Sequence, residues 1–415
     1  MPNESGIAFE TSDLQKSGET KNLIKNWETI YRKKQWNRYA TFDKKGGFNV
    51  PYLLFKAKNI TDIETRKIKW EKARPIAPQT KHPMKRLFHL TGRAWSFITA
   101  NIPGDHFVLK KGSEVVPFLQ KAQADLQDKG KIRAVIKDIE GCFPNMPKPA
   151  IILALTEILH NITTLKGFDA VYVPTANSKQ CKWSTKAVGH KKIPFEVLMD
   201  VMKFSLSNTI IANPKGDLFN QVKGIPMGDP HSPGMTIGTC AWMEKEWMDT
   251  IHDDSKQFFR ARRYMDDILM FYASNEEFLC DKLLHDFGKS ECYFPPLSLE
   301  DAKPDTFLET TFEITDNKIR YWLKNENKAH LPPQIWRYAH FKSHMAYEVK
   351  RGVLNATLKK VHSMASDRRA LYHSALQKLH EFYNLQYPKR MLWTACTTMG
   401  VQSRETTWFD IREEI

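Results

Sequence analysis

Residues 257–272 read QFFRARRYMDDILMFY, an apolar stretch whose middle carries two adjacent carboxylates, Asp266 and Asp267. Apolar and aromatic residues on both sides of the pair predict a β-hairpin with the carboxylates at its turn. Neighbouring like charges repel each other, and burial nearby makes the repulsion worse. A divalent cation removes that repulsion, because Mg²⁺ binds carboxylate oxygens and substrate phosphates together. Asp is also common in ordinary turns, so this hairpin alone leaves a plain polar turn as an alternative.

A third carboxylate, Asp138, stands at the end of a predicted buried strand that begins near Val135. Pro147 is predicted in the first turn of the helix that follows, whose apolar residues recur at helical spacing from Ile151 to Leu159. Two metal ions roughly 3.5–4 Å apart need ligands from more than one segment of a chain. Asp138 is therefore predicted to join the carboxylates of the hairpin. An ordinary strand-end residue is the alternative.

A bent loop lies between these two segments. It runs from Gln221 to Gly234, QVKGIPMGDPHSPG, and its glycines and prolines leave little side-chain bulk. Such a loop lets a backbone approach a base pair or a phosphate closely. Ser232 is predicted to cap the following helix, and Pro233 to be its first residue. A generic Gly–Pro turn before a helix is the alternative.

In this order the three segments resemble motifs A, B and C of reverse transcriptases, and the resemblance covers roughly residues 65 to 365. The box Tyr264-Met265-Asp266-Asp267 is shared with retroviral and hepadnaviral enzymes. Other details are similar to Penelope-like elements, which are relatives of telomerase. The residues that carry this similarity are Phe143-Pro144-Asn145-Met146-Pro147, Phe219, Gln221, Gly224, Met227, Gly228, Ser232, Pro233, Phe307-Leu308-Glu309 and Ser343-His344.

The resemblance implies an α+β right-hand polymerase fold, with fingers, a palm of antiparallel sheet and helices, and a helical thumb. The expected boundaries are 1–40 for a polar and basic helical extension, 41–130 for the fingers, 131–328 for the palm with an inserted fingers-type segment at about 161–215, and 329–415 for the thumb and C-terminal tail. Within them, residues 21–40 are expected to form a basic aromatic helix that either packs on the fingers or is solvated. Residues 171–183 are expected to form a hairpin, and 195–211 a helix.

The implied activity is that of an RNA-directed DNA polymerase, from a retroelement or a domesticated relative, which extends a primer with dNTPs. Asp138 and Asp266 would bind two Mg²⁺ ions, with Mn²⁺ as an alternative, and Asp267 would orient or assist. Ile139 would be a further metal ligand. The implied partners are an RNA template, a DNA or RNA primer duplex and dNTPs.

The resemblance also implies binding residues. An aromatic residue at Phe143 would lie under the nucleotide sugar and exclude a 2′-hydroxyl, although plain core packing is an alternative. Lys67 and Arg74 have the spacing of seven residues expected for triphosphate contacts, which can also arise by chance in a basic segment. The expected nucleotide contacts are Arg74, Lys67, Phe143, Gln221, Met227 and Gly228. The expected template–primer contacts are Tyr264, Met265, Ser232, Pro233, Lys350, Arg351 and Lys359.

Some positions depart from the family pattern. Asp229 and His231 replace small residues that are usual in the loop, which puts template contact there in doubt. Lys137 stands before the motif A carboxylate, where an apolar residue or Phe is usual. Lys289 and Lys303 are both candidates for the lysine that protonates pyrophosphate, and neither matches the pattern closely.

Composition supports a polyanionic partner. The 415 residues include 62 Lys+Arg against 47 Asp+Glu, a formal charge of +15. A basic chain of this size suggests a polyanionic partner, and a solvated basic surface is the alternative that charge alone leaves open. Six cysteines without a Cys-x-x-Cys pattern predict neither a zinc site nor a disulfide framework. We therefore expect a reducing intracellular compartment, nuclear or cytoplasmic. The polar N-terminus predicts no signal peptide, and the lack of a long apolar run predicts no membrane span.

Three other functions remain open at this point. An RNA-dependent RNA polymerase would use the same fold and metals, but Phe143 argues against it. A catalytically inactive nucleic-acid-binding relative is disfavoured because all three carboxylates are present. A domesticated cellular polymerase or a protein-priming viral enzyme would differ in biology rather than in chemistry.

Overall fold

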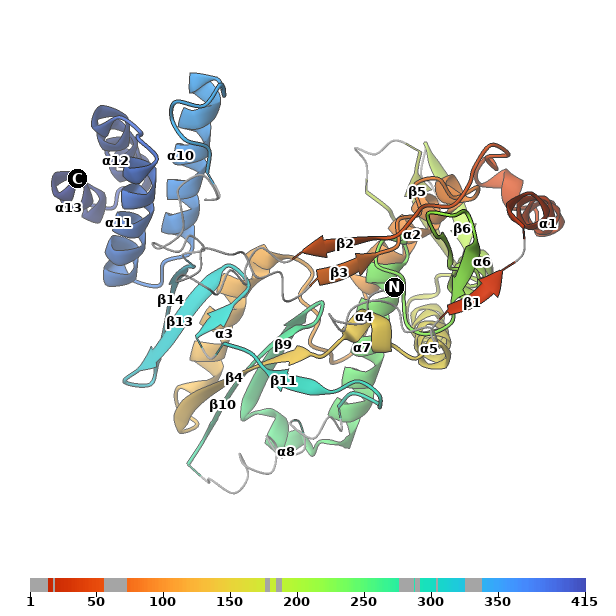
Figure 1. The fold of residues 1–415 in the computed structure, drawn as a ribbon. Helices are drawn as coiled ribbons and strands as arrows, with labels where there is room; N and C mark the ends of the chain where they lie inside the picture. Colours follow the sequence, from red (N-terminus) through yellow and green to blue (C-terminus); the bar gives the residue numbers. More distant parts are fainter. Residues whose placement is uncertain are drawn as a thin grey trace, which may run out of the picture. The chain divides into compact units, whose positions relative to one another are not determined.

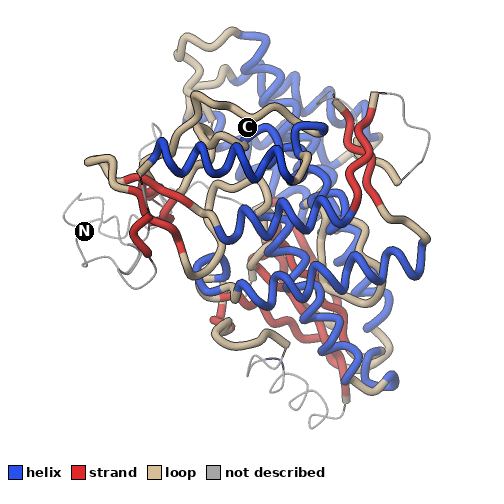
Figure 2. The backbone as a smooth tube through the Cα atoms, turned by 90° about the vertical axis from the view of Figure 1, so that its right-hand side faces the viewer, coloured by secondary structure: helices blue, strands red, loops and turns tan. Residues whose placement is uncertain are grey.

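The computed structural model describes residues 14–17, 19–55, 73–175, 180–183, 189–275, 287, 292–303, 305–324 and 338–415. Figure 2 colours the helices and strands formed by these residues, and both kinds of element are abundant. The predicted α+β class is therefore confirmed.

The chain forms two compact units, and each unit is assembled from separate stretches of sequence. Unit 1 comprises Met1–Val108, Ile139–Ile251 and His285–Leu299, and unit 2 comprises Leu109–Asp138, His252–Leu284 and Glu300–Ile415. The expected boundaries of fingers, palm and thumb remain predictions.

Unit 1 contains six of the α-helices in the described part of the chain and seven strands. Its helices are α1 (Thr20–Lys33), α2 (Lys85–Thr99), α4 (Cys142–Asn145), α5 (Lys148–Lys166), α6 (Phe195–Ser207) and α7 (Ser232–Thr250). Its strands are β1 (Leu14–Ser17), β2 (Tyr52–Phe55), β3 (Ala73–Ile76), β5 (Ala170–Pro174), β6 (His190–Pro194), β7 (Ile210–Ala212) and β8 (Leu218–Gln221). They pair as a sheet of order β1-β8-β7 and as the hairpins β2-β3 and β5-β6.

Unit 2 combines two sheets with a helical C-terminal part. Its helices are α3 (Val115–Leu126), α8 (Asp253–Lys256), α10 (Tyr347–Ser363), α11 (Arg368–Asn384), α12 (Lys389–Ser403) and α13 (Thr407–Glu414). Its strands are β4 (Lys131–Ile139), β9 (Phe259–Tyr264), β10 (Asp267–Ser274), β12 (Thr306–Phe307), β13 (Thr310–Thr315) and β14 (Lys318–Leu323), and β11 (Leu299–Asp301) enters it at Glu300.

The larger sheet has the order β11-β4-β10-β9 (Figure 1). β10 is antiparallel to both β4 and β9. Because side chains alternate along a strand, Ile132 and Ile136 of β4 share one face with Leu269 and Phe271 of β10. These four side chains are buried in one cluster with residues of α3, β13 and β14. Burial of each side chain of this size contributes about 1.5–3 kcal/mol to the free energy of folding. The strand register that turns this face to the core is therefore strongly favoured.

Helix α7 packs closely on its neighbours in unit 1. A Cβ atom on Gly234 would lie 2.8 Å from the Cβ of Trp95 in α2. A Cβ atom on Gly238 would lie 2.5 Å from a methyl group of Leu155 in α5. The helix that follows the loop is therefore held against both helices at a distance that only glycine permits.

The basic aromatic helix near the N-terminus buries one face and exposes its basic side chains to solvent. Trp27 and Tyr31 of α1 are buried, as is Trp36 in the 3-10 turn Trp36–Arg38. The Trp27 ring stacks on His82 at 4.8 Å and meets Phe204 edge-on. The helix packs within unit 1 through this aromatic face, and its expected packing on the fingers remains a prediction.

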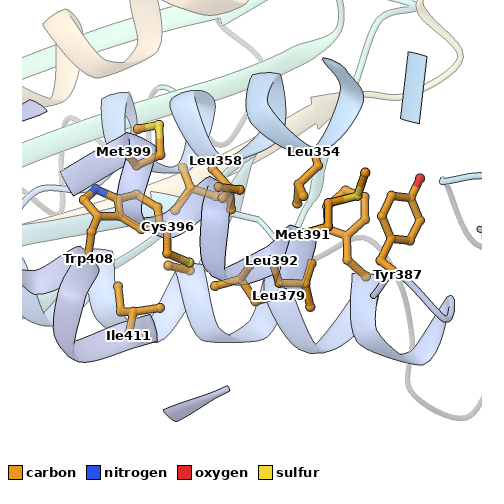
Figure 3. Close-up of a cluster of buried hydrophobic side chains, with 14 of the residues drawn as sticks. Leu354, Leu358, Leu379, Tyr387, Met391, Leu392, Cys396, Met399, Trp408 and Ile411 are labelled. Atoms are coloured by element: carbon orange, nitrogen blue, oxygen red, sulfur yellow. The ribbon is translucent and has the colours of Figure 1, made fainter. Parts of the chain in front are cut away.

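The C-terminal helices share one core, shown in Figure 3. Leu354 of α10, Leu379 of α11, Leu392 of α12 and Trp408 of α13 are each fully buried in it. The helical character predicted for residues 329–415 is confirmed for Tyr347–Glu414, apart from the turns between these helices. Among the helices of the described residues, none is long and apolar enough to cross a membrane.

Two expected elements differ from the structure. The hairpin strand β5 pairs with His190–Pro194, and Lys182 forms only a single bridge to Tyr172. This register sets Val171 opposite Ile193, both fully buried, which a polar Lys182 strand could not do. The helix expected to reach 211 ends at Ser207, because Ile210–Ala212 form the strand β7 against β8.

Three expected boundaries also shift. β4 begins at Lys131 and continues one residue past Asp138. Pro147 precedes α5 with extended backbone instead of lying in its first turn. Ser232 is the first residue of α7, not its cap, and its hydroxyl donates to the carbonyl of Pro226 at 2.5 Å.

Candidate active site

The adjacent carboxylates lie where β9 turns into β10, with Asp266 in the turn and Asp267 as the first residue of β10. Tyr264 pairs with Asp267, so Met265 and Asp266 form a two-residue turn. Met265 has a φ of +59°. Two-residue hairpins need positive φ and normally place Gly or Asn there, so Met at this position stores about 1–3 kcal/mol of strain. Such strain is typical of functional turns.

A buried arginine supports this turn from β9. Arg263 is 1% exposed, and its Nη1 donates to the carbonyl of Met265 at 2.7 Å. Its own carbonyl accepts from the backbone of Leu109 at 2.8 Å. A charge-assisted bond to the turn backbone fixes the position of the carboxylate that follows Met265.

The third carboxylate lies directly opposite the second. Asp138 of β4 pairs with Asp267 of β10, so both side chains point to the same face of the sheet. Both are half-buried, at the end of the face that Ile136 and Leu269 make apolar. The Cβ atoms of directly opposite residues are about 4.5–5.5 Å apart. Asp266 lies next in the chain, in the turn, so the backbone brings all three carboxylates to one end of the sheet.

The residues fit a divalent cation in chemistry and in backbone position. Opposed carboxylates are the ligands that Mg²⁺ prefers, and like charges directly opposite each other destabilise a sheet unless they are neutralised. Among the described residues, however, no three His, Cys, Asp or Glu side chains converge into a ready-made metal site. Ile139, the expected further ligand, is buried at the end of β4.

Lys137 has a partner that accounts for its presence. Its side chain points to the opposite face from Asp138, because neighbours on a strand alternate. Its Nζ lies 2.8 Å from Oδ1 of Asp301 on the edge strand β11. The lysine therefore links β4 to the edge strand β11 through an ion pair.

In unit 1, the segment after β4 is tied to the Gly–Pro loop. The carbonyl of Phe143 accepts from the amide of Ile225 at 2.8 Å. Gly224 has a φ of +70°, and a Cβ atom there would lie 2.3 Å from the carbonyl oxygen of Pro144. Phe143 itself is half-buried in α4. Only glycine allows this close approach, so the backbones of the two segments are in direct contact.

Lys148 adds a second tie, which sequence reasoning missed. Its Nζ donates to the carbonyls of Leu206 and Gln221, each at 2.7 Å. Burial lowers the pKa of Lys148 to about 8. A lysine just after a strand–helix junction resembles any surface lysine, so no local signal could have identified it.

The loop also meets the end of β3. The amide of Ala77 donates to the carbonyl of Met227 at 2.7 Å. Met227 is half-buried and Gly228 exposed. Arg74 lies on β3 three residues before Ala77, whereas Lys67 lies outside the described residues.

Three of the residues expected to contact nucleotide or template have buried side chains. Gln221 is 3% exposed, and its side-chain amide donates to the carbonyl of Lys223. Ser232 is 2% exposed and braces the loop through Pro226. Lys350 is 5% exposed, and its Nζ donates to the carbonyl of Ser343. Each of these side chains bonds a backbone carbonyl of its own unit, and their contacts with nucleotide or template remain predictions.

The other expected contacts remain accessible. Tyr264, Pro233, Arg351 and Lys359 are exposed, and Met265 is half-buried. Arg351 forms an ion pair with Glu348 at 2.7 Å, which solvent leaves weak. Of the two candidate general acids, Lys303 is exposed and Lys289 lies outside the described residues.

The two departures in the loop prove to be buried. Asp229 is 6% exposed and His231 fully buried, and they bond to each other. Burial alone would raise the pKa of Asp229, but the charge of His231 and hydrogen bonds from His231 and Ser205 outweigh it and lower the pKa. The doubt about template contact is thereby resolved for their side chains, which face the protein interior.

The fold is similar to that of telomerase from Candida albicans, solved in complex with a TWJ fragment of telomeric RNA. The TM-score is 0.57 at 11% sequence identity, covering 96% of this chain and 68% of that chain. Telomerase from Candida tropicalis, also in complex with a TWJ fragment of telomeric RNA, gives 0.47 at 13% identity, covering 92% and 57%. The Sicinivirus 3Dpol RNA-dependent RNA polymerase gives 0.42 at 13% identity, covering 88% and 68%. No protein-family model and no curated protein sequence matches the chain. At such low identity the first likeness establishes a polymerase-like fold and nothing finer.

Proposed function

We propose that this protein is an RNA-directed DNA polymerase that extends a primer with dNTPs by nucleotidyl transfer. The observation that carries the proposal is the pairing of Asp138 with Asp267 beside the strained turn that holds Asp266. The polymerase-like fold supports it, since this arrangement occurs on a scaffold similar to telomerase.

Asp138, Asp266 and Asp267 would hold the metal ions. Mg²⁺ bound there would supply the positive charge that acidifies a primer 3′-hydroxyl and neutralises the triphosphate. Arg263 would keep the turn in position through its bond to Met265. The residues of this chain thus position charge; they form no covalent bond with substrate.

Phe143 would select the sugar. Its carbonyl is fixed by Ile225, so the backbone that carries the ring is held in one place. An aromatic ring under the sugar would leave no room for a 2′-hydroxyl and would favour deoxynucleotides. Gly228, Met227 and Arg74 would contribute the remaining nucleotide contacts, and Tyr264, Met265, Pro233, Arg351 and Lys359 the template–primer contacts.

An RNA template is the proposed partner. The telomerase from Candida albicans was solved with telomeric RNA, and the net charge of +15 suits a polyanion. The basic charge alone does not distinguish RNA from DNA, so the template must be tested directly.

Primer extension on poly-riboadenylate with an oligo-deoxythymidine primer tests the proposal. Wild type would be compared with Asp266→Asn and Phe143→Ala, using dTTP or UTP. Asp253→Asn is the matched control, because Asp253 is an exposed carboxylate of the same unit whose side chain pairs only locally with Lys256.

We expect wild type and Asp253→Asn to incorporate dTTP, Asp266→Asn to lose extension, and Phe143→Ala to accept UTP. Robust UTP incorporation by wild type would make the protein an RNA polymerase instead. Tight duplex binding without extension would point to the inactive relative.

A further inference from the structure

The loop Met227–Ser232 is anchored by one of its own side chains, the carboxylate of Asp229. Both oxygens of Asp229 are engaged: Oδ1 accepts from the backbone amide of His231 at 2.7 Å and lies 2.8 Å from its Nδ1. Oδ2 accepts from the hydroxyl of Ser205 in α6 at 2.5 Å. A buried carboxylate with three such bonds is strongly oriented. Asp229 therefore fastens the loop to α6.

His231 makes the second anchor. Its Nε2 lies 2.7 Å from the hydroxyl of Thr91 in α2, and its ring meets Phe88 edge-on at 5.2 Å. Between the two anchors, the carbonyl of Pro230 lies so close to Gly92 that a Cβ there would be 2.5 Å from its oxygen. The loop is thus held to two helices over the span from Asp229 to His231.

The other end of the same loop holds the exit of β3. Ala77 donates to Met227, and a Cβ atom on Gly228 would lie 2.7 Å from the carbonyl oxygen of Ala77. Gly228 has a φ of +130°, a backbone angle that residues other than glycine rarely adopt. Residues 227 and 228 contact Ala77, the residue directly after β3, while 229 and 231 bond to α6 and α2. One short loop therefore connects the exit of β3 with both helices.

We propose that Asp229 and His231 are positioning residues that hold Met227 and Gly228 against the end of β3. The inference rests on the proposed function in one respect, namely that a nucleotide contacts β3 and this loop. Their side chains would then act through the position of the loop, since neither is exposed.

Two conservative substitutions remove the anchors without changing the loop itself. Ser205→Ala removes the hydroxyl that donates to Asp229, and Thr91→Val removes the one that meets His231. Two helical residues of unit 1 provide matched controls. Among the described residues, the hydroxyls removed by Thr156→Val and Ser96→Ala each bond the carbonyl four residues earlier.

Two readouts separate positioning from general stability. Hydrogen–deuterium exchange by mass spectrometry would follow a peptide containing Ala77 and one spanning 227–232. Steady-state extension would give KM for dTTP and kcat separately. For each anchor variant we expect exchange at Ala77 to rise about fivefold and KM to rise about fivefold, the ratio that one hydrogen bond of ordinary strength supports, with kcat within about twofold of wild type.

Faster exchange at 227–232 with unchanged exchange at Ala77 would overturn the proposal, as would equal effects in the controls. A fall in kcat with unchanged KM would also overturn it. If wild type extends no primer, the proposed function fails, and the exchange at Ala77 still decides whether Asp229 and His231 position the end of β3.

Discussion

Replacing Asp267 by Asn should stabilise the metal-free protein and abolish its stabilisation by Mg²⁺. Asp267 lies directly opposite Asp138, and both are half-buried. Removing one charge relieves their repulsion. It also removes a ligand that the cation would need.

The magnitude follows from the register. Opposite Cβ atoms are about 5 Å apart, and two unit charges at about 5 Å repel by roughly 3 kcal/mol at an effective dielectric constant of about 20 and by roughly 1 kcal/mol in water. For half-buried groups we expect the free energy of unfolding without metal to rise by about 1–2 kcal/mol. In wild type, Mg²⁺ at about ten times its dissociation constant would add about 1.4 kcal/mol.

The assay is urea unfolding of wild type, Asp267→Asn and the exposed control Asp253→Asn, each in EDTA and in Mg²⁺. The control should match wild type under both conditions, because Asp253 lies at the protein surface on α8. Neither measurement needs polymerase activity.

A lower stability of Asp267→Asn in EDTA would refute the repulsion between the paired carboxylates. An Mg²⁺ stabilisation of equal size in wild type and Asp267→Asn would refute the assigned metal site. Either result would return Asp266 and Asp267 to the status of an ordinary polar turn.

Arg263→Met should lower the free energy of unfolding by about 1.5–3 kcal/mol, because the carbonyl of Met265 loses a charge-assisted bond; wild-type stability in urea would contradict this. Gly228→Ala should cost about 1–3 kcal/mol through strain at positive φ and the contact with Ala77, and an unchanged melting temperature would rule that out. The pKa of Lys148 is lowered to about 8 from 10.5. Between about pH 8 and pH 10.5, Lys148 holds its proton in the unfolded chain but has released it in the folded state. The free energy of unfolding therefore rises with pH in this range. Lys148→Gln should reduce the slope of the free energy of unfolding against pH in this range, measured by urea unfolding. An unchanged slope would argue against the lowered pKa of Lys148.

Much of the local structure was predictable from the chain. Apolar and aromatic residues on both sides of Asp266 and Asp267 predicted the β9–β10 hairpin, and the structure has it with a two-residue turn. Helix α5 follows the apolar spacing from Ile151 to Leu159 in the same way. Boundaries failed where a tertiary partner intervened: Ser232 starts α7 because its hydroxyl bonds Pro226 and does not cap the helix.

Side-chain orientation was less predictable. Gln221 and Lys350 were expected to face substrate or nucleic acid, but each is buried with a backbone partner. Asp229 and His231 were recognised only as departures from a pattern, because their partners Ser205 and Thr91 lie on other helices. A polar residue in a sequence carries no sign of whether it points outward or into such a network.

The sequence by itself determined the hairpin with its adjacent carboxylates, the strand that carries Asp138 and the α+β class, because period and turn chemistry are local properties. Only the tertiary structure decided that Asp138 lies opposite Asp267 and that Asp229 faces α6. Register between strands and contacts between distant helices depend on how the whole chain buries its apolar faces, and a shift of one residue would turn Asp138 to the other side of the sheet.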